Sequence, residues 1–193
     1  MKRGATKEEI IRTTQDLITR NGIRAVRVDE IAQRLGISKR TLYEMFADKN
    51  DLISACLDDL ARRQRQRIAA SRRRRSGNPL QRTLRLANDY IDSLYTVDHS
   101  FLADIRRKVL FAEQYDEHRE FWRKELSLNL EEYRGGGLLL SEIDTAALAE
   151  QLMSTLFELR LNRTTREELY LLCRTILRGA ATQQGIDLID RKP

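Results

Sequence analysis

The sequence contains few residues that break helices, form disulfides or bind metals. Two prolines and nine glycines in 193 residues leave long stretches without a helix breaker. Cys56 and Cys173 lie 117 residues apart, with no C-x-x-C pair and no histidine beside either of them. Neither a disulfide framework nor a zinc site is therefore predicted, and we interpret both cysteines as small buried hydrophobic residues.

Long apolar runs are also missing. The chain has no stretch of about 18 apolar residues, the length that a membrane-spanning helix needs. The first residues, MKRGATKEEIIRT, carry charge but lack the apolar segment and the cleavage site of a signal peptide. We therefore expect a cytoplasmic protein that makes no contact with a membrane.

The motifs of common enzymes are absent as well. The sequence has no nucleophile elbow, phosphate-binding P-loop, HExxH motif or Rossmann fingerprint. Its two histidines, His99 and His118, fall in separate predicted helices and form no Ser/Cys–His–Asp arrangement. The sequence therefore predicts no enzyme, no catalytic residue, no metal site and no cofactor.

The residues that are present indicate a globular, all-α chain of one or two compact units. Hydrophobic residues make up 41% and charged residues 33%, outside the composition of disordered chains. Residues 1–75 hold 19 Lys and Arg against 10 Asp and Glu, a net charge of +9, whereas residues 76–193 have a net charge of −3. This asymmetry favours a polyanionic partner at the N-terminal end, with the solubility of Arg-rich helices as the alternative.

Capping signals predict three short helices at the N-terminus. Thr6 and Glu9 form a capping box, and Gly22 ends the helix that they begin. A second helix runs from Val28 to about Arg34, and after the turn GIS a third begins at Lys39. Two short helices joined by a glycine-containing turn predict a helix-turn-helix over residues 28–47.

The third helix has one apolar and one polar side. Leu42, Met45 and Phe46 are predicted to face the first two helices. The outward residues are Arg40, Tyr43, Glu44 and Ala47, with Lys39 at the edge. Arg and Lys can donate to guanine O6 and N7 in the major groove, so this face is a candidate DNA-reading surface.

From Thr6 to Leu52 the chain resembles the tetracycline-repressor (TetR) family of bacterial regulators, which includes TetR/AcrR-like proteins. The pieces IA, LGIS and TLY, a Phe three residues after that Tyr, and a Lys three residues after that Phe carry the resemblance. It covers 47 of the 193 residues. It implies a three-helix DNA-binding domain used as a homodimer on a pseudo-palindromic operator.

The resemblance also implies which residues contact DNA. These are Lys39, Arg40, Thr41, Tyr43 and Met45 on the recognition helix, Lys49 at a phosphate, and Arg27 at the cap of the second helix. The family usually has Thr at position 27, a small residue at position 40, and an aromatic residue or His at position 45. Arg40 is therefore expected to make a base contact of this chain's own.

Other roles stay open for four of these residues. Tyr43 can instead pack in the core, and Lys39 and Arg40 can simply be solvated. Lys49 can pair with Asp48 or Asp51.

A connecting helix is predicted over residues 51–75, and its end is rich in arginine. Eight of the fourteen residues from 62 to 75 are Arg. We favour a solvated helix end followed by a mobile loop for the Arg72–Arg75 run. A long-range attraction for DNA and an anion-binding patch are the alternatives.

Residues 76–193 are predicted to form a helical ligand-binding and dimerisation domain, which brings the total to about nine helices. Asn78 and Pro79 begin one helix, and the triple glycine 135–137 ends another. Two further helices over residues 144–183 have broad apolar stripes, and in the TetR family the last two helices form the dimer interface. The aromatic residues of this part are more often core than pocket, so no ligand-binding residue is predicted.

The sequence thus predicts three parts: a DNA-binding domain over residues 1–50, the connector, and the domain over residues 76–193. The expected function is that of a homodimeric repressor, released from its operator by a small molecule of unknown identity. A ligand-independent structural or nucleoid-associated DNA-binding protein is the alternative.

Overall fold

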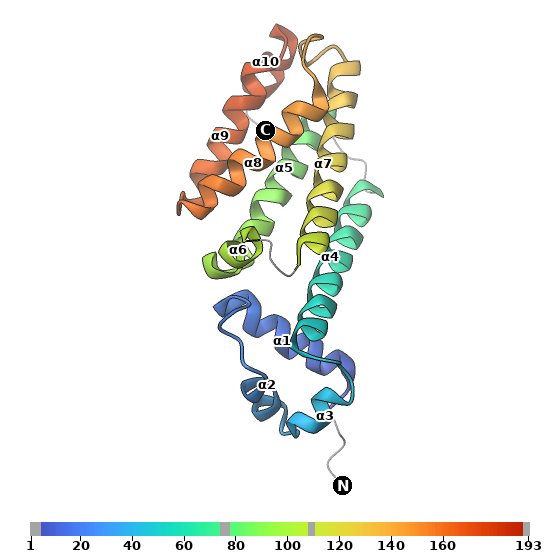
Figure 1. Ribbon diagram of the computed structural model, residues 1–193. Coiled ribbons are helices and arrows are strands. Elements are labelled where there is room, and N and C mark those ends of the chain that lie inside the picture. The colour runs from blue at the N-terminus through green and yellow to red at the C-terminus, as the bar shows by residue number, and fades with distance from the viewer. Residues whose placement is uncertain (1–4, 74–77, 108–110, 191–193) are drawn as a thin grey trace. The chain divides into compact units, whose positions relative to one another are not determined.

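The computed structural model describes residues 5–73, 78–107 and 111–190, and their secondary structure is helical apart from one β-bridge, between Leu139 and Ala181. The predicted all-α fold is therefore confirmed (Figure 1). The helices of the described residues are α1 (Lys7–Asn21), α2 (Val28–Leu35), α3 (Lys39–Tyr43), α4 (Lys49–Arg73), α5 (Pro79–Tyr95), α6 (His99–Arg106), α7 (Ala112–Gly135), α8 (Thr145–Leu161), α9 (Arg166–Gly179) and α10 (Gln183–Asp190).

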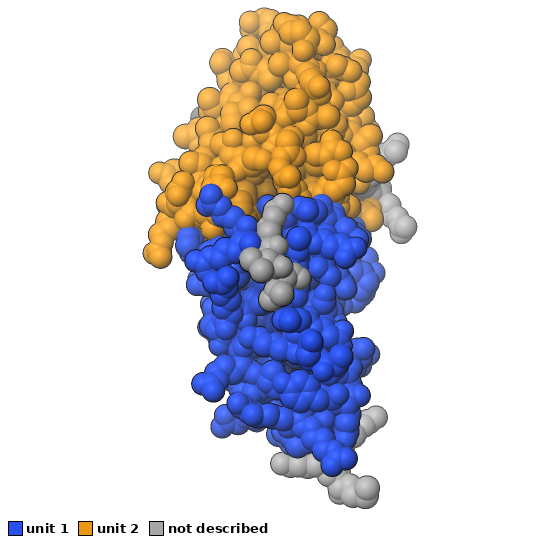
Figure 2. All heavy atoms as spheres, in the orientation of Figure 1, with its two compact units in different colours: residues 1–67, 97–118 blue, residues 68–96, 119–193 orange. Residues whose placement is uncertain are grey.

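The chain divides into two compact units that do not follow the order of the sequence. Unit 1 comprises residues 1–67 and 97–118, and unit 2 comprises residues 68–96 and 119–193 (Figure 2). The three-part division predicted from the sequence assigns residues 97–118 to the C-terminal part. The structure groups this segment with the N-terminal helices instead.

Local signals set the first helix of unit 1. The Thr6 side chain accepts a hydrogen bond from the Glu9 backbone N–H at 3.2 Å, and the Glu9 carboxylate accepts one from the Thr6 N–H at 2.8 Å. This is the predicted capping box, which satisfies two of the free N–H groups at the helix start. Gly22 ends α1 with a φ of +84°, a conformation that a side chain would strain.

The segment 97–118 is tied to α1 through α6. The Asp98 N–H donates to the Thr19 carbonyl at 2.6 Å. A Cβ at Gly22 would lie 2.9 Å from both the Asp104 carboxylate and the Ser100 side chain, so α6 approaches the end of α1 closely. Because these residues lie about 80 positions apart in the chain, no local pattern predicts this contact.

Aromatic packing forms the middle of unit 2. Trp122 is completely buried, and its ring meets that of Tyr90 edge-on with 5.2 Å between the centroids. The Tyr90 hydroxyl donates to the Met153 carbonyl at 3.3 Å, and Phe157 is also buried. For these three aromatic residues the prediction of a core role is confirmed.

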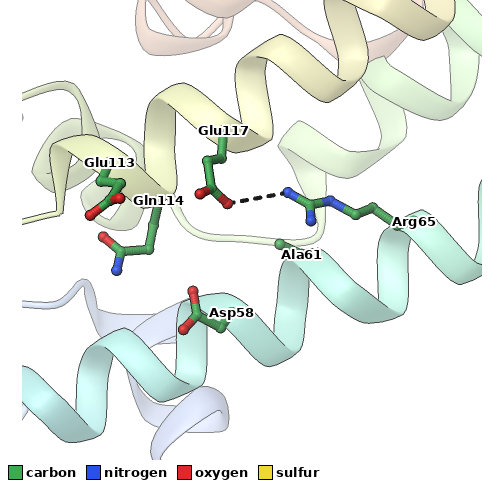
Figure 3. A pocket seen from close by; sticks show the side chains of 6 residues that line it. All are labelled: Asp58, Ala61, Arg65, Glu113, Gln114 and Glu117. Atoms are coloured by element: carbon green, nitrogen blue, oxygen red, sulfur yellow. Dashed lines mark ion pairs between the residues drawn. The ribbon is translucent and has the colours of Figure 1, made fainter.

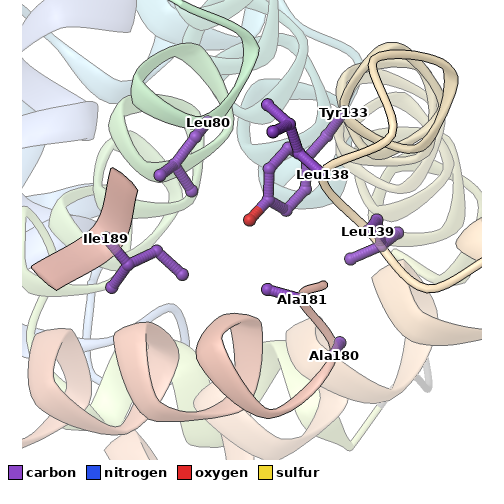
Figure 4. Packing of buried hydrophobic residues seen from close by; sticks show 7 residues of the cluster. All are labelled: Leu80, Tyr133, Leu138, Leu139, Ala180, Ala181 and Ile189. Atoms are coloured by element: carbon purple, nitrogen blue, oxygen red, sulfur yellow. The ribbon is translucent and has the colours of Figure 1, made fainter. Parts of the chain in front are cut away.

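A second apolar cluster joins the end of α7 to α10. Its buried members are Leu80, Tyr133, Leu138, Leu139, Ala180, Ala181 and Ile189 (Figure 4). The Tyr133 hydroxyl points into the middle of the cluster and has no hydrogen-bond partner among the described residues. Burial raises the pKa of this phenol to about 12.

Several predicted limits need correction. The recognition helix ends at Tyr43 rather than near residue 47, α7 begins at Ala112 rather than near residue 117, and α10 was not predicted. Because α10 follows them, α8 and α9 are not the last two helices of the chain. Of the Arg72–Arg75 run, Arg74 and Arg75 lie outside the described residues, and the side chains of Arg72 and Arg73 are not described either.

Candidate nucleic-acid interface

The turn between α2 and α3 is built by backbone and capping contacts. Gly36 ends α2 in the left-handed region at φ +64°, and the Ile37 N–H donates to the Ala32 carbonyl at 3.0 Å. The Ser38 side chain then accepts a hydrogen bond from the Thr41 N–H at 3.1 Å and caps α3. These contacts reproduce the helix-turn-helix that the sequence predicts.

Two buried side chains hold α3 in place. Leu42 is completely buried and Phe46 is 2% exposed, as predicted for the inward side. The Lys7 ammonium lies over the Phe46 ring, 5.0 Å from its centroid. Met45, predicted both to face inward and to approach DNA, is half-buried.

The other side of α3 is exposed and carries two cations and a phenol. The exposed fraction of the Arg40 side chain is 90% and that of Lys39 is 57%, while Tyr43 is 46% exposed as a whole residue. The alternative of core packing for Tyr43 is therefore excluded. Arg40 and Lys39 are positioned as a reading surface requires, although their contacts with DNA stay a prediction.

Each of these cations is paired with a carboxylate. The Arg40 Nε donates to Glu44 Oε1 at 3.2 Å, one helical turn away. The Lys39 ammonium lies 2.5 Å from the Asp29 carboxylate in the first turn of α2. Glu44 was predicted to lie on the same outward face as Arg40, but neither ion pair was predicted. The i, i+4 spacing of Arg40 and Glu44 is the signal from which the first pair could have been predicted.

The remaining predicted DNA-contact residues differ in their surroundings. Arg27 is exposed at the start of α2 and makes no side-chain cap, whereas Thr41 is half-buried with its hydroxyl 3.0 Å from that of Ser38. Burial lowers the pKa of Lys49, and the Asp104 carboxylate partly offsets this effect. Lys49 makes no ion pair with Asp48 or Asp51 among the described contacts.

Those two aspartates instead cap the start of α4. The Asp51 N–H donates to the Asp48 carboxylate at 2.8 Å, and the Ala47 N–H donates to the Asp51 carboxylate at 2.9 Å. These two hydrogen bonds fix the turn that joins α3 to α4. The two carboxylates therefore cap the helix rather than pair with the Lys49 ammonium.

Unit 1 also holds a polar cleft between α4 and α7, with a volume of about 390 Å³. Its lining residues are Asp58, Ala61 and Arg65 from α4 and Glu113, Gln114 and Glu117 from α7 (Figure 3). Three carboxylates against one guanidinium make the lining acidic. No sequence pattern predicted this cleft, because its two sides lie about 50 residues apart in the chain.

The charges of the cleft interact with one another. Arg65 pairs with Glu117 at 3.6 Å, and the Gln114 amide donates to the Ser54 hydroxyl at 2.7 Å. Burial and the neighbouring Glu117 carboxylate raise the pKa of Asp58. A cation bound here would relieve the repulsion between these carboxylates.

His118 lies next to this cleft in unit 1. Burial, followed by the charge of Arg65, lowers the pKa of His118 to about 4, so the imidazole is neutral at pH 7. Within the described ranges, no group of three or more His, Cys, Asp or Glu side chains could hold a metal ion. None of the described helices is long and apolar enough to cross a membrane.

The geometry of α2 and α3 places the chain among helix-turn-helix proteins. The family model of "Bacterial regulatory proteins, tetR family" matches residues 10–56, which confirms the resemblance. An uncharacterized HTH-type transcriptional regulator of Mycobacterium tuberculosis is 43% identical over 51 residues. That alignment covers 26% of this chain and 21% of the relative, so it concerns the DNA-binding segment alone.

Solved structures extend the likeness to the fold of the whole chain. A putative transcriptional regulator from Saccharomonospora viridis, solved in complex with choline, has a TM-score of 0.78 and 18% identity and covers 91% of this chain and 96% of its own. A TetR transcription regulator from Haloarcula marismortui has the same score and identity, covering 91% and 98%. At 18% identity these likenesses concern the fold, and both of these solved proteins are described as transcription regulators.

Proposed function

We propose that this protein is a homodimeric transcriptional repressor that binds a pseudo-palindromic operator and is released by a small molecule. It would act in the bacterial cytoplasm, associated with the nucleoid while it is bound to DNA. One observation carries the proposal: α3 is anchored by buried Leu42 and Phe46 and exposes Lys39, Arg40 and Tyr43 on one side. Such a helix can enter the major groove while its anchors keep it attached to α1 and α2.

Footprinting tests operator binding. The purified protein is incubated with the DNA beside its own gene, and we expect protection of two half-sites whose centres lie about 34–36 Å apart. Many weak sites with no symmetric protected region would instead favour the nucleoid-associated alternative.

The salt dependence of binding tests the role of Lys49. If its ammonium holds a phosphate, Lys49→Ala should reduce the slope of log K against log salt concentration by about 0.9. Lys124→Ala is the control, because Lys124 is an exposed lysine of α7 in unit 2. Equal slopes for the wild type and Lys49→Ala would contradict a phosphate contact.

The proposed dimer interface lies on α8 and α9, within residues 144–183. Leu171 on α9 is 67% exposed, the highest value among the large apolar side chains of the described residues. A second copy of the chain would cover it through a two-fold contact. Leu171→Glu should shift the mass measured by light scattering from dimer to monomer, whereas the same change at exposed Leu128 should not.

The acidic cleft suggests which ligands to test first. Three carboxylates and one arginine favour a small cation, and one protein of similar fold was solved with choline, which is a cation. We expect choline or 1,4-diaminobutane to raise the melting temperature and to release the operator, and butyrate to do neither.

Cleft variants test whether the cation binds at this site. Asp58→Asn combined with Glu117→Gln should abolish both responses, whereas Glu120→Gln, which changes an exposed carboxylate of α7 outside the cleft lining, should keep them. Unchanged responses in the double variant would exclude the cleft as the ligand site.

A further inference from the structure

The contact between Arg40 and Glu44 involves only one edge of the guanidinium. Glu44 Oε1 accepts from Nε at 3.2 Å, and no hydrogen bond or ion pair of the two terminal nitrogens is found among the described residues. A guanidinium has a side edge at Nε and an end formed by the two terminal nitrogens. Recognition of guanine O6 and N7 needs two such donors, and here the terminal pair is available.

The ion pair between Arg40 and Glu44 adds little to the stability of the helix. The side chains of Arg40 and Glu44 are 90% and 59% exposed, and an exposed i, i+4 pair shifts the helix equilibrium by only about twofold. Glu44 also sits at the C-terminal end of α3, where the helix dipole disfavours a carboxylate, and the order Arg before Glu is the weaker one.

The negative charge of Glu44 would oppose the electrostatic attraction between this face and DNA of any sequence. It belongs to the exposed side of α3, so on a duplex its carboxylate would come near phosphates. In water, two unit charges 10 Å apart interact with about 0.4 kcal/mol, which corresponds to about a twofold change in affinity. At such a distance the charge of Glu44 would weaken binding to DNA of any sequence by about twofold.

We infer that Glu44 is the specificity-determining partner of Arg40: it holds the guanidinium by Nε, presents the terminal nitrogens to a guanine of the operator, and repels phosphates of random DNA. This inference rests on the proposed function. It assigns the operator a G·C pair in each half-site, read by the Arg40–Glu44 unit.

Selection from a random duplex DNA library tests the inference. The wild-type chain should enrich a symmetric motif with one strongly preferred guanine per half-site. Arg40→Ala should lower discrimination at that base pair by about 5- to 150-fold, the range for a bidentate contact. Glu44→Ala should lower it by about twofold, since the exposed pair that holds Arg40 in place is lost.

Two further variants separate the two effects of Glu44. Glu44→Gln keeps an oxygen that accepts from Nε but loses the charge, so the guanine preference should remain while binding to random DNA rises about twofold. In an Arg40→Ala background, Glu44→Ala should cause no further loss of discrimination, because Glu44 acts through Arg40.

Glu30 provides a matched control. On α2, Arg34 and Glu30 form the same kind of exposed i, i+4 pair, at 3.1 Å. Glu30→Ala should leave the guanine preference and the binding of random DNA unchanged. The inference is overturned if Glu44→Ala behaves like Glu30→Ala, or if Glu44→Ala still lowers discrimination when Arg40 is absent.

The outcomes also separate this inference from the function itself. A wild-type chain that enriches no motif would contradict the proposed function, and the inference with it. A clear symmetric motif that is unaffected by Glu44→Ala would contradict the inference alone.

Discussion

Two short helices of this chain, α3 and α10, are fixed in opposite ways. α3 is set by nearby residues: Ser38 caps it, and Leu42 and Phe46 anchor it. α10 depends on the segment about 45 residues earlier, since the Thr182 N–H donates to the Leu138 carbonyl at 3.0 Å and the Thr182 hydroxyl donates to the Gly137 carbonyl at 2.9 Å. A helix that is capped and anchored by its own residues can thus be recognised from the sequence, whereas a helix that depends on a distant segment cannot.

The largest effect is expected at the anchor of α3. Phe46→Ala removes a buried ring and should lower the free energy of unfolding by about 3–5 kcal/mol. Chemical denaturation monitored by circular dichroism measures this change. Tyr43→Ala removes an exposed ring and serves as the control, and an equal loss in both variants would contradict the anchoring role.

A smaller loss is expected where α10 packs closely. A Cβ at Gly185 would lie 2.2 Å from the Leu138 carbonyl oxygen, so Gly185→Ala must displace α10 and should cost about 1–3 kcal/mol. Gly179→Ala is the matched control, because a Cβ there meets nothing within 4 Å. Helix propensity alone predicts that the control gains up to about 1 kcal/mol. Hydrogen exchange of the α10 amides should report the difference.

The cap of α3 should contribute less than its anchor. Ser38→Ala removes the side-chain acceptor for the Thr41 N–H and should cost about 1 kcal/mol. Ser38→Gly should cost only a few tenths of a kcal/mol, since glycine is tolerated at this position. If thermal melts rank the two variants in the reverse order, the capping bond is not what stabilises α3.

The smallest effect, and one of opposite sign, is expected at Tyr133. Tyr133→Phe removes a buried hydroxyl that has no hydrogen-bond partner among the described residues. The free energy of unfolding should therefore rise by up to about 1 kcal/mol. Tyr95→Phe is the control, because it loses a hydrogen bond to the Thr164 carbonyl and should be destabilised. Chemical denaturation at pH 7 measures the free energy of unfolding of both variants.

The pH dependence gives a second measurement on Tyr133. Its pKa is about 12 in the folded chain and about 10 in an unfolded one, so the unfolded chain loses its proton first. Wild-type stability should therefore fall as the pH rises from about 10 to 12, and this part of the fall should be missing in Tyr133→Phe. Identical alkaline profiles would mean that the phenol is solvated.

Much of the fold follows from signals spanning only a few residues. Thr6 with Glu9 and Asn78 with Pro79 predict helix starts that the structure contains. The buried state of Cys56 and Cys173 was predicted as well, and burial raises the pKa of both thiols to about 12. Each of these features depends on local hydrogen bonding or on hydrophobicity, which the order of residues contains directly.

The remaining features arise from contacts between distant segments. The Asp104 carboxylate accepts from the Arg24 N–H at 3.0 Å across 80 positions, and the acidic cleft combines residues of α4 and α7. α10 has a local cap, since the Thr182 hydroxyl accepts from the Gly185 N–H at 3.3 Å, but its glycine lowers the helix propensity. Such contacts form only when whole helices pack together. The chain must first close the loop between the two segments, and this closure has an entropy cost that no local pattern shows.

The sequence by itself therefore determined the helices up to α9, the helix-turn-helix and the side chains that face outward from α3. Only the tertiary structure decided that segment 97–118 joins the N-terminal helices, that α10 completes the core around Tyr133, and that α4 and α7 share an acidic cleft. Capping bonds and amphipathic periodicity act within a few residues, whereas burial and long-range charge pairing depend on the packing of the whole chain.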